Sequence, residues 1–304
     1  MRGMGGSLTL KDLGYHFDQN GEFRRISDNG RFIFTNQEDY EKLGCAMTNE
    51  LYSILENQCG LVRIDVTVGV EDEHNNLRNY RSFVYASRGF RDKSTVVLII
   101  HGSGAVRPGQ WSRRLILNEG LNVGSQVPYI QRAHDNDWGV ILCNTNTSEE
   151  FCGYPQQHLR AVYDQLLSGT TSIQRVLVVA HSRGGQDFVL AFPHFKNDDR
   201  IVAVCLTDSI NFEMPHCLTE EANSKGPVFI NWIANSDIRQ TCGSDGDMVD
   251  VFSRVHQIYA GTTEHERTSY SALNSVFYVL ENLKSPSDLP ELLPTAAKLT
   301  SGEV

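Results

Sequence analysis

The sequence lacks the long apolar stretches and the excess of positive charge that mark two large classes of protein. Its longest apolar cluster, residues 96–100, is far shorter than the roughly 18 residues that a membrane-spanning helix needs. The first residues also lack the apolar core of a secretory signal. Charge is acidic, since 27 Lys and Arg stand against 37 Asp and Glu, a net charge of −10. We therefore expect neither membrane insertion nor direct binding to nucleic acid.

Patterned cysteines are missing as well. The 7 cysteines are an odd number and show neither a disulfide framework nor the spacing of a zinc site. Cys143 and Cys205 lie in apolar runs, where a thiol behaves as a small buried hydrophobe. This usage predicts a reducing intracellular compartment, nuclear or cytoplasmic, and no metal or other cofactor is expected.

Six apolar runs follow one another in the second part of the chain, and helical patterns separate several of them. The runs are 95–100, 138–143, 175–180, 201–206, 227–233 and 257–260. Because they are apolar throughout and do not alternate, they suit strands buried on both faces of a parallel sheet. Strand alternating with helix indicates a doubly wound, mostly parallel α/β sheet, in which ligands bind at the C-terminal ends of strands.

The segment before these runs has a different pattern. We expect a hairpin at 15–24, a helix at 36–59, a half-buried strand at 61–70 and its antiparallel partner at 80–85. Both the hairpin and the two strands are predicted to extend one edge of the sheet.

Three segments are expected along the chain. Residues 1–12 are predicted to be a disordered start, and residues 13–283 a single α/β-hydrolase-like domain. Residues 284–304, rich in Pro, Ser and Leu, read as a C-terminal tail.

The segment 180–184, Ala-His-Ser-Arg-Gly, carries the strongest chemical signal. The pattern has a small residue two positions before Ser182 and Gly184 two positions after it, and it lies between a buried strand and a helix. This is the context of a nucleophile elbow. The tight turn needs small residues two positions before and after the serine, and Ala180 meets that need in place of the usual glycine. The turn holds the hydroxyl at the helix N-terminus, where backbone N–H groups can stabilise an oxyanion. The alternative is that Ser182 merely caps the helix.

A serine nucleophile needs a base and an acid that orients it, and in hydrolases of this fold the acid and then the base follow the serine along the chain. His265 follows the last apolar run and is the candidate base. Two acids are open: Asp208 ends the fourth run, and Asp237 follows the fifth. Each of these residues has a plainer interpretation as a surface, turn or cap residue.

A candidate oxyanion hole completes the arrangement. Gly102, Ser103 and Gly104 follow the first apolar run, where such folds supply one backbone N–H. Gly102 permits close approach, and Ser103 or Gly104 can supply the N–H. Arg183, directly after the nucleophile, supplies the second. The same glycines also suit a simple tight turn.

The sequence resembles the Argonaute-binding-protein domain family. The segments that carry the resemblance are 107–112 (Arg-Pro-Gly-Gln-Trp-Ser), 120–121, 124–130, 14–34, 206–209 and 260–265. The resemblance covers roughly residues 13–283, and the Gly-Gln-Trp segment is its most specific part. The family includes fission-yeast silencing factors, a domain appended to fungal class II histone deacetylases, and a vertebrate co-transcriptional regulator.

This resemblance implies an α/β-hydrolase-like fold and roles in small-RNA silencing, heterochromatin or splicing, through contact with Argonaute or chromatin-associated proteins. The family's Asp-Ser pair corresponds to Asp208-Ser209, which favours Asp208 over Asp237 as the acid. Some members look degenerate at the elbow, whereas this chain keeps Ser182 and His265.

Two hypotheses follow. The chain is a serine hydrolase acting on a small ester, thioester or amide, or it is a non-catalytic scaffold that uses the same fold to bind Argonaute or chromatin proteins. An acidic domain would bind a basic protein more naturally than RNA.

Overall fold

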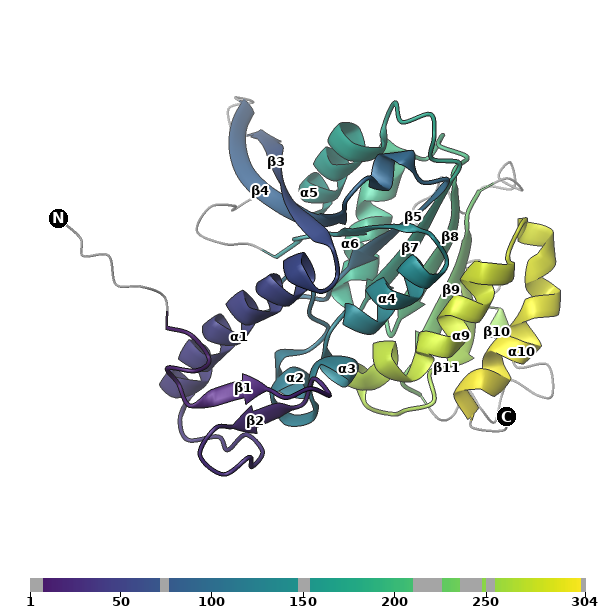
Figure 1. Ribbon diagram of the computed structural model, residues 1–304. Coiled ribbons are helices and arrows are strands. Elements are labelled where there is room, and N and C mark those ends of the chain that lie inside the picture. Colours follow the sequence, from purple (N-terminus) through teal and green to yellow (C-terminus); the bar gives the residue numbers. More distant parts are fainter. Residues whose placement is uncertain are drawn as a thin grey trace.

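The computed structural model (Figure 1) describes residues 8–71, 77–146, 154–209, 226–235, 248–249 and 255–301. Within these residues, one sheet has nine strands and a second, small sheet has two. Helices cover both faces of the large sheet. The fold is α/β-hydrolase-like, a mostly parallel sheet extended at one edge by antiparallel strands.

The N-terminal elements are β1 (Tyr15–Phe17), β2 (Phe23–Arg25), α1 (Gln37–Asn57), β3 (Leu61–Glu71) and β4 (Leu77–Ser87). β3 and β4 form the predicted antiparallel extension, with β4 paired to β6 (Gly139–Leu142) of the central sheet. Helix α1 begins after Asn36, whose side chain accepts a hydrogen bond from the Asp39 backbone N–H at 2.9 Å.

The first hairpin does not join the large sheet, so the expectation that it extends the edge is wrong. β1 and β2 pair only with each other. Tyr15 stacks on Phe23, with ring centroids 5.0 Å apart, and the Leu121 N–H donates to the Gly21 carbonyl at 2.8 Å. The stacking lies within the hairpin, and the hydrogen bond from Leu121 ties the hairpin to the helices that follow β5 (Thr95–Ile100). The sheet edge is occupied by β3.

The central strands are β5 (Thr95–Ile100), β6 (Gly139–Leu142), β7 (Arg175–His181), β8 (Ile201–Thr207), β9 (Val228–Ile233) and β11 (Val255–Tyr259). The strand order is β10-β11-β9-β8-β7-β5-β6-β4-β3, with β10 (Met248–Val249) antiparallel to β11. From β11 to β6 every neighbouring pair is parallel. The chain passes from β5 to β6 on one side and returns to β7 on the other, so the order reverses beside β5. Such a reversal opens a crevice at the C-terminal ends of the strands.

Alternate side chains of each central strand enter two different cores. In β5, Val97 and Ile99 join one core, and Val96 and Leu98 join the other. The first core contains side chains of α1, α2 (Arg113–Glu119), α3 (Leu121–Gly124), α4 (Val127–Asp135), α9 (Thr268–Asn282) and α10 (Leu289–Ser301). The second contains α5 (Pro155–Val162) and α6 (Arg183–Ala191). Burial on both faces explains why these strands are continuously apolar.

The two ends of the chain contribute to the first core. Residues 286–301, which the composition marks as a tail, form a short 3-10 turn and α10. Leu289, Leu293 and Ala296 are buried, and the Ser275 hydroxyl in α9 donates to the Ala296 carbonyl at 2.6 Å. Leu10, placed by the sequence in a disordered start, is also buried there. Apolar side chains at helical spacing decide the packing of the C-terminal segment more than its Pro and Ser content.

Candidate active site

The turn between β7 and α6 holds Ser182 in a strained conformation. Its φ is 52° and its ψ is −126°, a region that costs a residue other than glycine about 1–3 kcal/mol. The Ser182 N–H donates to the Thr207 carbonyl at 2.9 Å, and its own carbonyl accepts from the Ser209 hydroxyl at 2.6 Å. Gly184 is required for space, because a Cβ there would lie 2.5 Å from the His101 carbonyl oxygen. The turn therefore has the strained backbone that a nucleophile elbow requires, and the surrounding hydrogen bonds and close packing hold it in that conformation.

Three side chains from separate elements meet at this elbow. The Ser182 hydroxyl lies 2.9 Å from His265 Nε2, and His265 Nδ1 lies 2.6 Å from Asp208 Oδ2. Ser182 follows β7, Asp208 follows β8, and His265 opens a 3-10 turn after β11. The second oxygen of Asp208 accepts from the Ala234 N–H at 3.0 Å. Because a carboxylate only accepts, Nδ1 carries the proton and Nε2 is left as an acceptor facing the serine hydroxyl.

The pKa values of Asp208 and His265 are shifted in the directions expected for an orienting acid and a base. Burial by itself would raise the pKa of Asp208, but the hydrogen bonds from His265 and the Ala234 N–H hold this pKa below its usual value. The hydrogen bond to Asp208 raises the pKa of His265, against the opposing effect of burial. Asp208 is thus ionised beside an imidazole that readily takes a proton.

Of the two acids that the sequence left open, Asp208 lies in this hydrogen-bonded series. Asp237 lies outside the residues that the structure describes. The backbone of Asp208 is also unusual, with a φ of 52°, and its N–H donates to the Trp232 carbonyl at 2.7 Å. This bend turns the carboxylate out of β8 toward His265.

The expected oxyanion residues lie around the same serine. Gly102 and Ser103 line one pocket with Ser182, and a Cβ on Gly102 would lie 3.3 Å from the Ser182 Cβ. Close approach of the two turns therefore favours glycine at 102. Gly104, the alternative donor, has a φ of 103° in the same loop. Arg183 is the first residue of α6, and its side chain turns away to pair with Asp187 at 3.1 Å.

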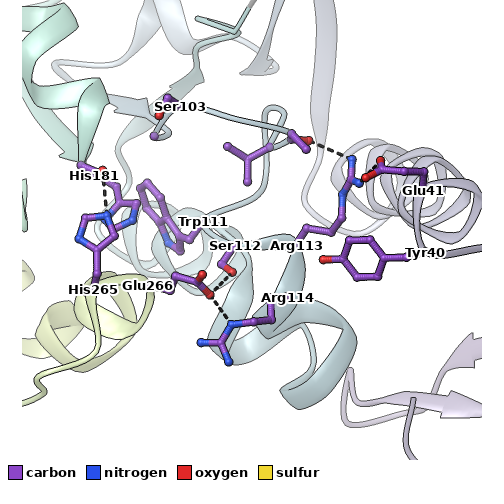
Figure 2. Close-up of a pocket in the computed structure, with 14 residues that line it drawn as sticks. Tyr40, Glu41, Ser103, Trp111, Ser112, Arg113, Arg114, His181, His265 and Glu266 are labelled. Carbon is purple, nitrogen blue, oxygen red and sulfur yellow. Dashed lines mark hydrogen bonds and ion pairs between the residues drawn. The ribbon is translucent and has the colours of Figure 1, made fainter. Parts of the chain in front are cut away.

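The pocket in front of Ser182 has a volume of about 310 Å³. One side is formed by Gly102, Ser103, His181, Ser182 and His265. Figure 2 shows the facing side, where Tyr40 and Glu41 of α1 lie beside Arg113 and Arg114 of α2. Sequence reasoning missed this wall, because α1 precedes the sheet strands and only the fold brings it to their ends.

Comparison with known proteins identifies the family. The chain is 38% identical over 299 residues to the FAM172 family protein homolog of Caenorhabditis elegans, covering 96% of this chain and 92% of that protein. The chain belongs to the FAM172 family. The model of the Arb2 domain matches residues 7–148. The cotranscriptional regulator ARB2A homolog of Xenopus tropicalis is 28% identical, over 88% of this chain and 78% of that protein. A histone deacetylase from Saccharomyces cerevisiae has 12% identity and a TM-score of 0.49, covering 82% of this chain and all (100%) of that chain.

The Gly-Gln-Trp segment of this FAM172 family member, residues 109–111, contacts α1 and the pocket. The Gln110 amide donates to the Thr48 hydroxyl of α1 at 2.8 Å, and the Gly109 N–H donates to the Gln126 side chain at 2.9 Å. Trp111 is buried at the pocket and packs edge-on against Tyr129 and His181. Within this segment, Trp111 therefore lines the pocket, and Gln110 supports the helix that forms its far wall.

His181 is the second histidine at the site, and sequence reasoning missed it. Its ring lies 4.9 Å from that of His265, tilted by 34°. It is buried, and its Nδ1 donates to the Thr207 carbonyl at 2.9 Å. Burial, followed by the nearby His265, lowers the pKa of His181 to about 4, so this ring stays neutral. Its place directly before Ser182 was the available signal.

The described residues contain neither a metal-binding cluster nor a membrane-spanning helix. No group of three or more His, Cys, Asp and Glu side chains in that part of the chain could hold a metal ion. Among the helices described, none has both the length and the apolar character needed to cross a membrane.

Proposed function

We propose that this FAM172 family member is a serine hydrolase that cleaves an ester, thioester or amide. The observation that supports this most is the unbroken series from Ser182 through His265 to Asp208, with contacts of 2.9 Å and 2.6 Å, at a strained turn. A serine that only capped α6 would need neither a histidine at its hydroxyl nor a carboxylate behind that histidine. The caps seen in this chain, such as Asn36, instead accept from the first turn of their helix.

In this mechanism the Ser182 oxygen bonds to the substrate carbonyl carbon while His265 Nε2 takes the hydroxyl proton. The carbonyl oxygen becomes an oxyanion, held by the backbone N–H groups of Arg183 and of Ser103 or Gly104. The bond to the leaving group then breaks, and His265 returns the proton to that group. Water releases the acyl group by the same steps, and the proton goes back to Ser182.

A fluorophosphonate probe, which forms a bond to activated serine, tests the proposal. We expect the folded wild-type protein to be labelled at Ser182 and the Ser182→Ala variant not to be labelled. Ser168→Ala is the matched control, because it removes an exposed serine hydroxyl outside the pocket, and it should be labelled like the wild type. No labelling of folded wild-type protein, or equal labelling of Ser182→Ala, would overturn the proposal.

The second candidate is a scaffold role in cotranscriptional regulation, because relatives at 28% and 26% identity are named cotranscriptional regulators. In this reading residues 13–283 act as one domain in the nucleus or cytoplasm and bind Argonaute or chromatin-associated proteins. The net charge of −10 favours a basic protein partner over nucleic acid.

Affinity capture distinguishes the two functions. A scaffold retains Argonaute or chromatin proteins after nuclease treatment, and the Ser182→Ala variant retains them equally. Absence of such partners in captures from intact nuclear and cytoplasmic fractions counts against the scaffold role.

A further inference from the structure

The side of the pocket next to His265 is the side from which a leaving group departs, because the histidine delivers its proton to that group. Glu266 follows His265 directly and lines the same pocket with Ser112 and Arg114. Figure 2 shows the Glu266 carboxylate between His265 and Arg114. A leaving group bound here would therefore meet Glu266 before it meets Arg114.

The two oxygens of Glu266 have unequal hydrogen bonding. Oε2 accepts from the Ser112 hydroxyl at 2.8 Å and from Arg114 Nε at 2.8 Å. Among the described residues, Oε1 has no hydrogen-bond partner, although a carboxylate has about four acceptor positions. The Glu266 side chain is 40% exposed, so a ligand can reach it. Burial would raise its pKa, but the bonds from Ser112 and Arg114 lower it, and the group is ionised.

The two arginines that line the pocket, Arg113 and Arg114, already form ion pairs with glutamates. Arg113 is 11% exposed; it pairs with Glu41 at 2.6 Å and donates to the Ala105 carbonyl at 3.2 Å. Arg114 is tied to Glu266 and lies 3.8 Å from a Glu264 oxygen. Both arginines of the pocket are therefore paired with glutamates. Oε1 of Glu266 remains available to a ligand beside His265.

We propose that the substrate has a positively charged leaving group, such as an amino alcohol or amino thiol with a fixed ammonium charge, held by Glu266. This inference rests on the proposed hydrolase function and names its substrate class. The net charge of −10 acts in the same direction, since it raises the local concentration of cations.

Two thioesters of equal shape test this proposal. Acetylthiocholine carries an ammonium charge in its leaving group, and in its isostere a carbon atom replaces the charged nitrogen. We expect wild-type protein to hydrolyse the charged thioester with a kcat/KM about fivefold higher, the effect of a partly exposed charge pair. Glu266→Gln keeps the acceptor for Ser112 and Arg114 but removes the charge, so this ratio should fall toward one.

Arg114→Gln is the opposing variant. It removes the cation that competes for Glu266, and the ratio should rise above the wild-type value. A wild-type ratio near one, or an unchanged ratio in Glu266→Gln, overturns the proposal. Protein whose Ser182 reacts with the fluorophosphonate but which releases no thiol from acetylthiocholine also overturns it. Loss of fluorophosphonate labelling itself would instead defeat the proposed hydrolase function.

Discussion

Histidines lie in two contrasting regions at the C-terminal ends of the central strands. His265 has a side chain that is 46% exposed, and its ring bonds a carboxylate, which raises its pKa. His101, His158 and His181 are buried, and each has a ring nitrogen hydrogen-bonded to a backbone group. We call these three the inner histidines and His265 the outer histidine. Burial is the main cause that lowers their pKa values to about 4, about 3 and about 4. The same side chain is thus an available base in one region and a fixed neutral group in the other.

The difference teaches that exposure and a carboxylate partner, more than residue type, decide which histidine can take a proton. His181 lies only 4.9 Å from His265, yet it stays neutral and does not compete for Asp208. The inner histidines hold the turns around the elbow in place. His101 Nδ1, for example, donates to the Gly102 carbonyl at 2.8 Å.

The largest expected effect comes from removing the carboxylate that distinguishes the outer histidine. Asp208→Asn should lower the rate of fluorophosphonate labelling about 10³–10⁴-fold, because the amide no longer fixes the tautomer or stabilises the imidazolium. The rate is measured by gel fluorescence against time.

Asp164→Asn is the control for this variant. Asp164 pairs with His194 at 2.9 Å on the surface, so this change breaks another His–Asp pair away from the pocket. Equal loss of labelling in both variants would show that the effect is not specific to the series at Ser182.

The inner histidines should make folding sensitive to mild acid. Above about pH 6.5 they are neutral in the folded and unfolded chain, and no stability is lost. Between that pH and their folded pKa values, the unfolded chain binds protons that the folded chain excludes, so stability falls as pH falls. Each of these histidines should lower the free energy of unfolding by about 1.5 kcal/mol between pH 6.5 and about pH 5.

Urea unfolding at the two pH values measures this loss. His101→Gln should reduce the dependence of the free energy of unfolding on pH, because it removes one of the three buried histidines. A wild-type free energy of unfolding that does not change with pH would contradict the assignment of the inner group.

The smallest expected effect concerns the outer histidine alone. Fluorophosphonate labelling needs His265 in its neutral form. The labelling rate should therefore fall as the pH drops through the raised pKa of His265. Glu266 adds to that rise, after the contribution of Asp208. Glu266→Gln should therefore move the pH profile toward acid without abolishing labelling. A profile that moves toward alkaline pH, or that does not depend on pH at all, would contradict this.

Several features follow from local sequence. Strands β5 to β9 lie close to their apolar runs, because burial on both faces leaves a continuous pattern. The tight turn at Ser182 can be predicted from the sequence, because such a turn needs small residues at positions 180 and 184. His265 was found because the base must follow the last strand.

Other features depend on contacts between distant segments. Asp208 and Asp237 each follow an apolar run in the sequence, and the family resemblance only favoured Asp208. In the structure a bend in the backbone brings Asp208 within 2.6 Å of His265. The separate first hairpin, the packed helix α10 and the α1 wall of the pocket are likewise set by which surfaces meet.

The sequence by itself determined the sheet, the nucleophile turn and the candidate base, because each is encoded by periodicity or by steric demands over a few neighbouring residues. The tertiary structure placed Asp208, which the resemblance had only favoured, against His265, and it alone decided the neutrality of His181 and the open carboxylate oxygen of Glu266. Each of these properties depends on contacts between residues tens of positions apart, and on how deeply those contacts bury a side chain. A pattern over a few neighbouring residues contains no information about such contacts.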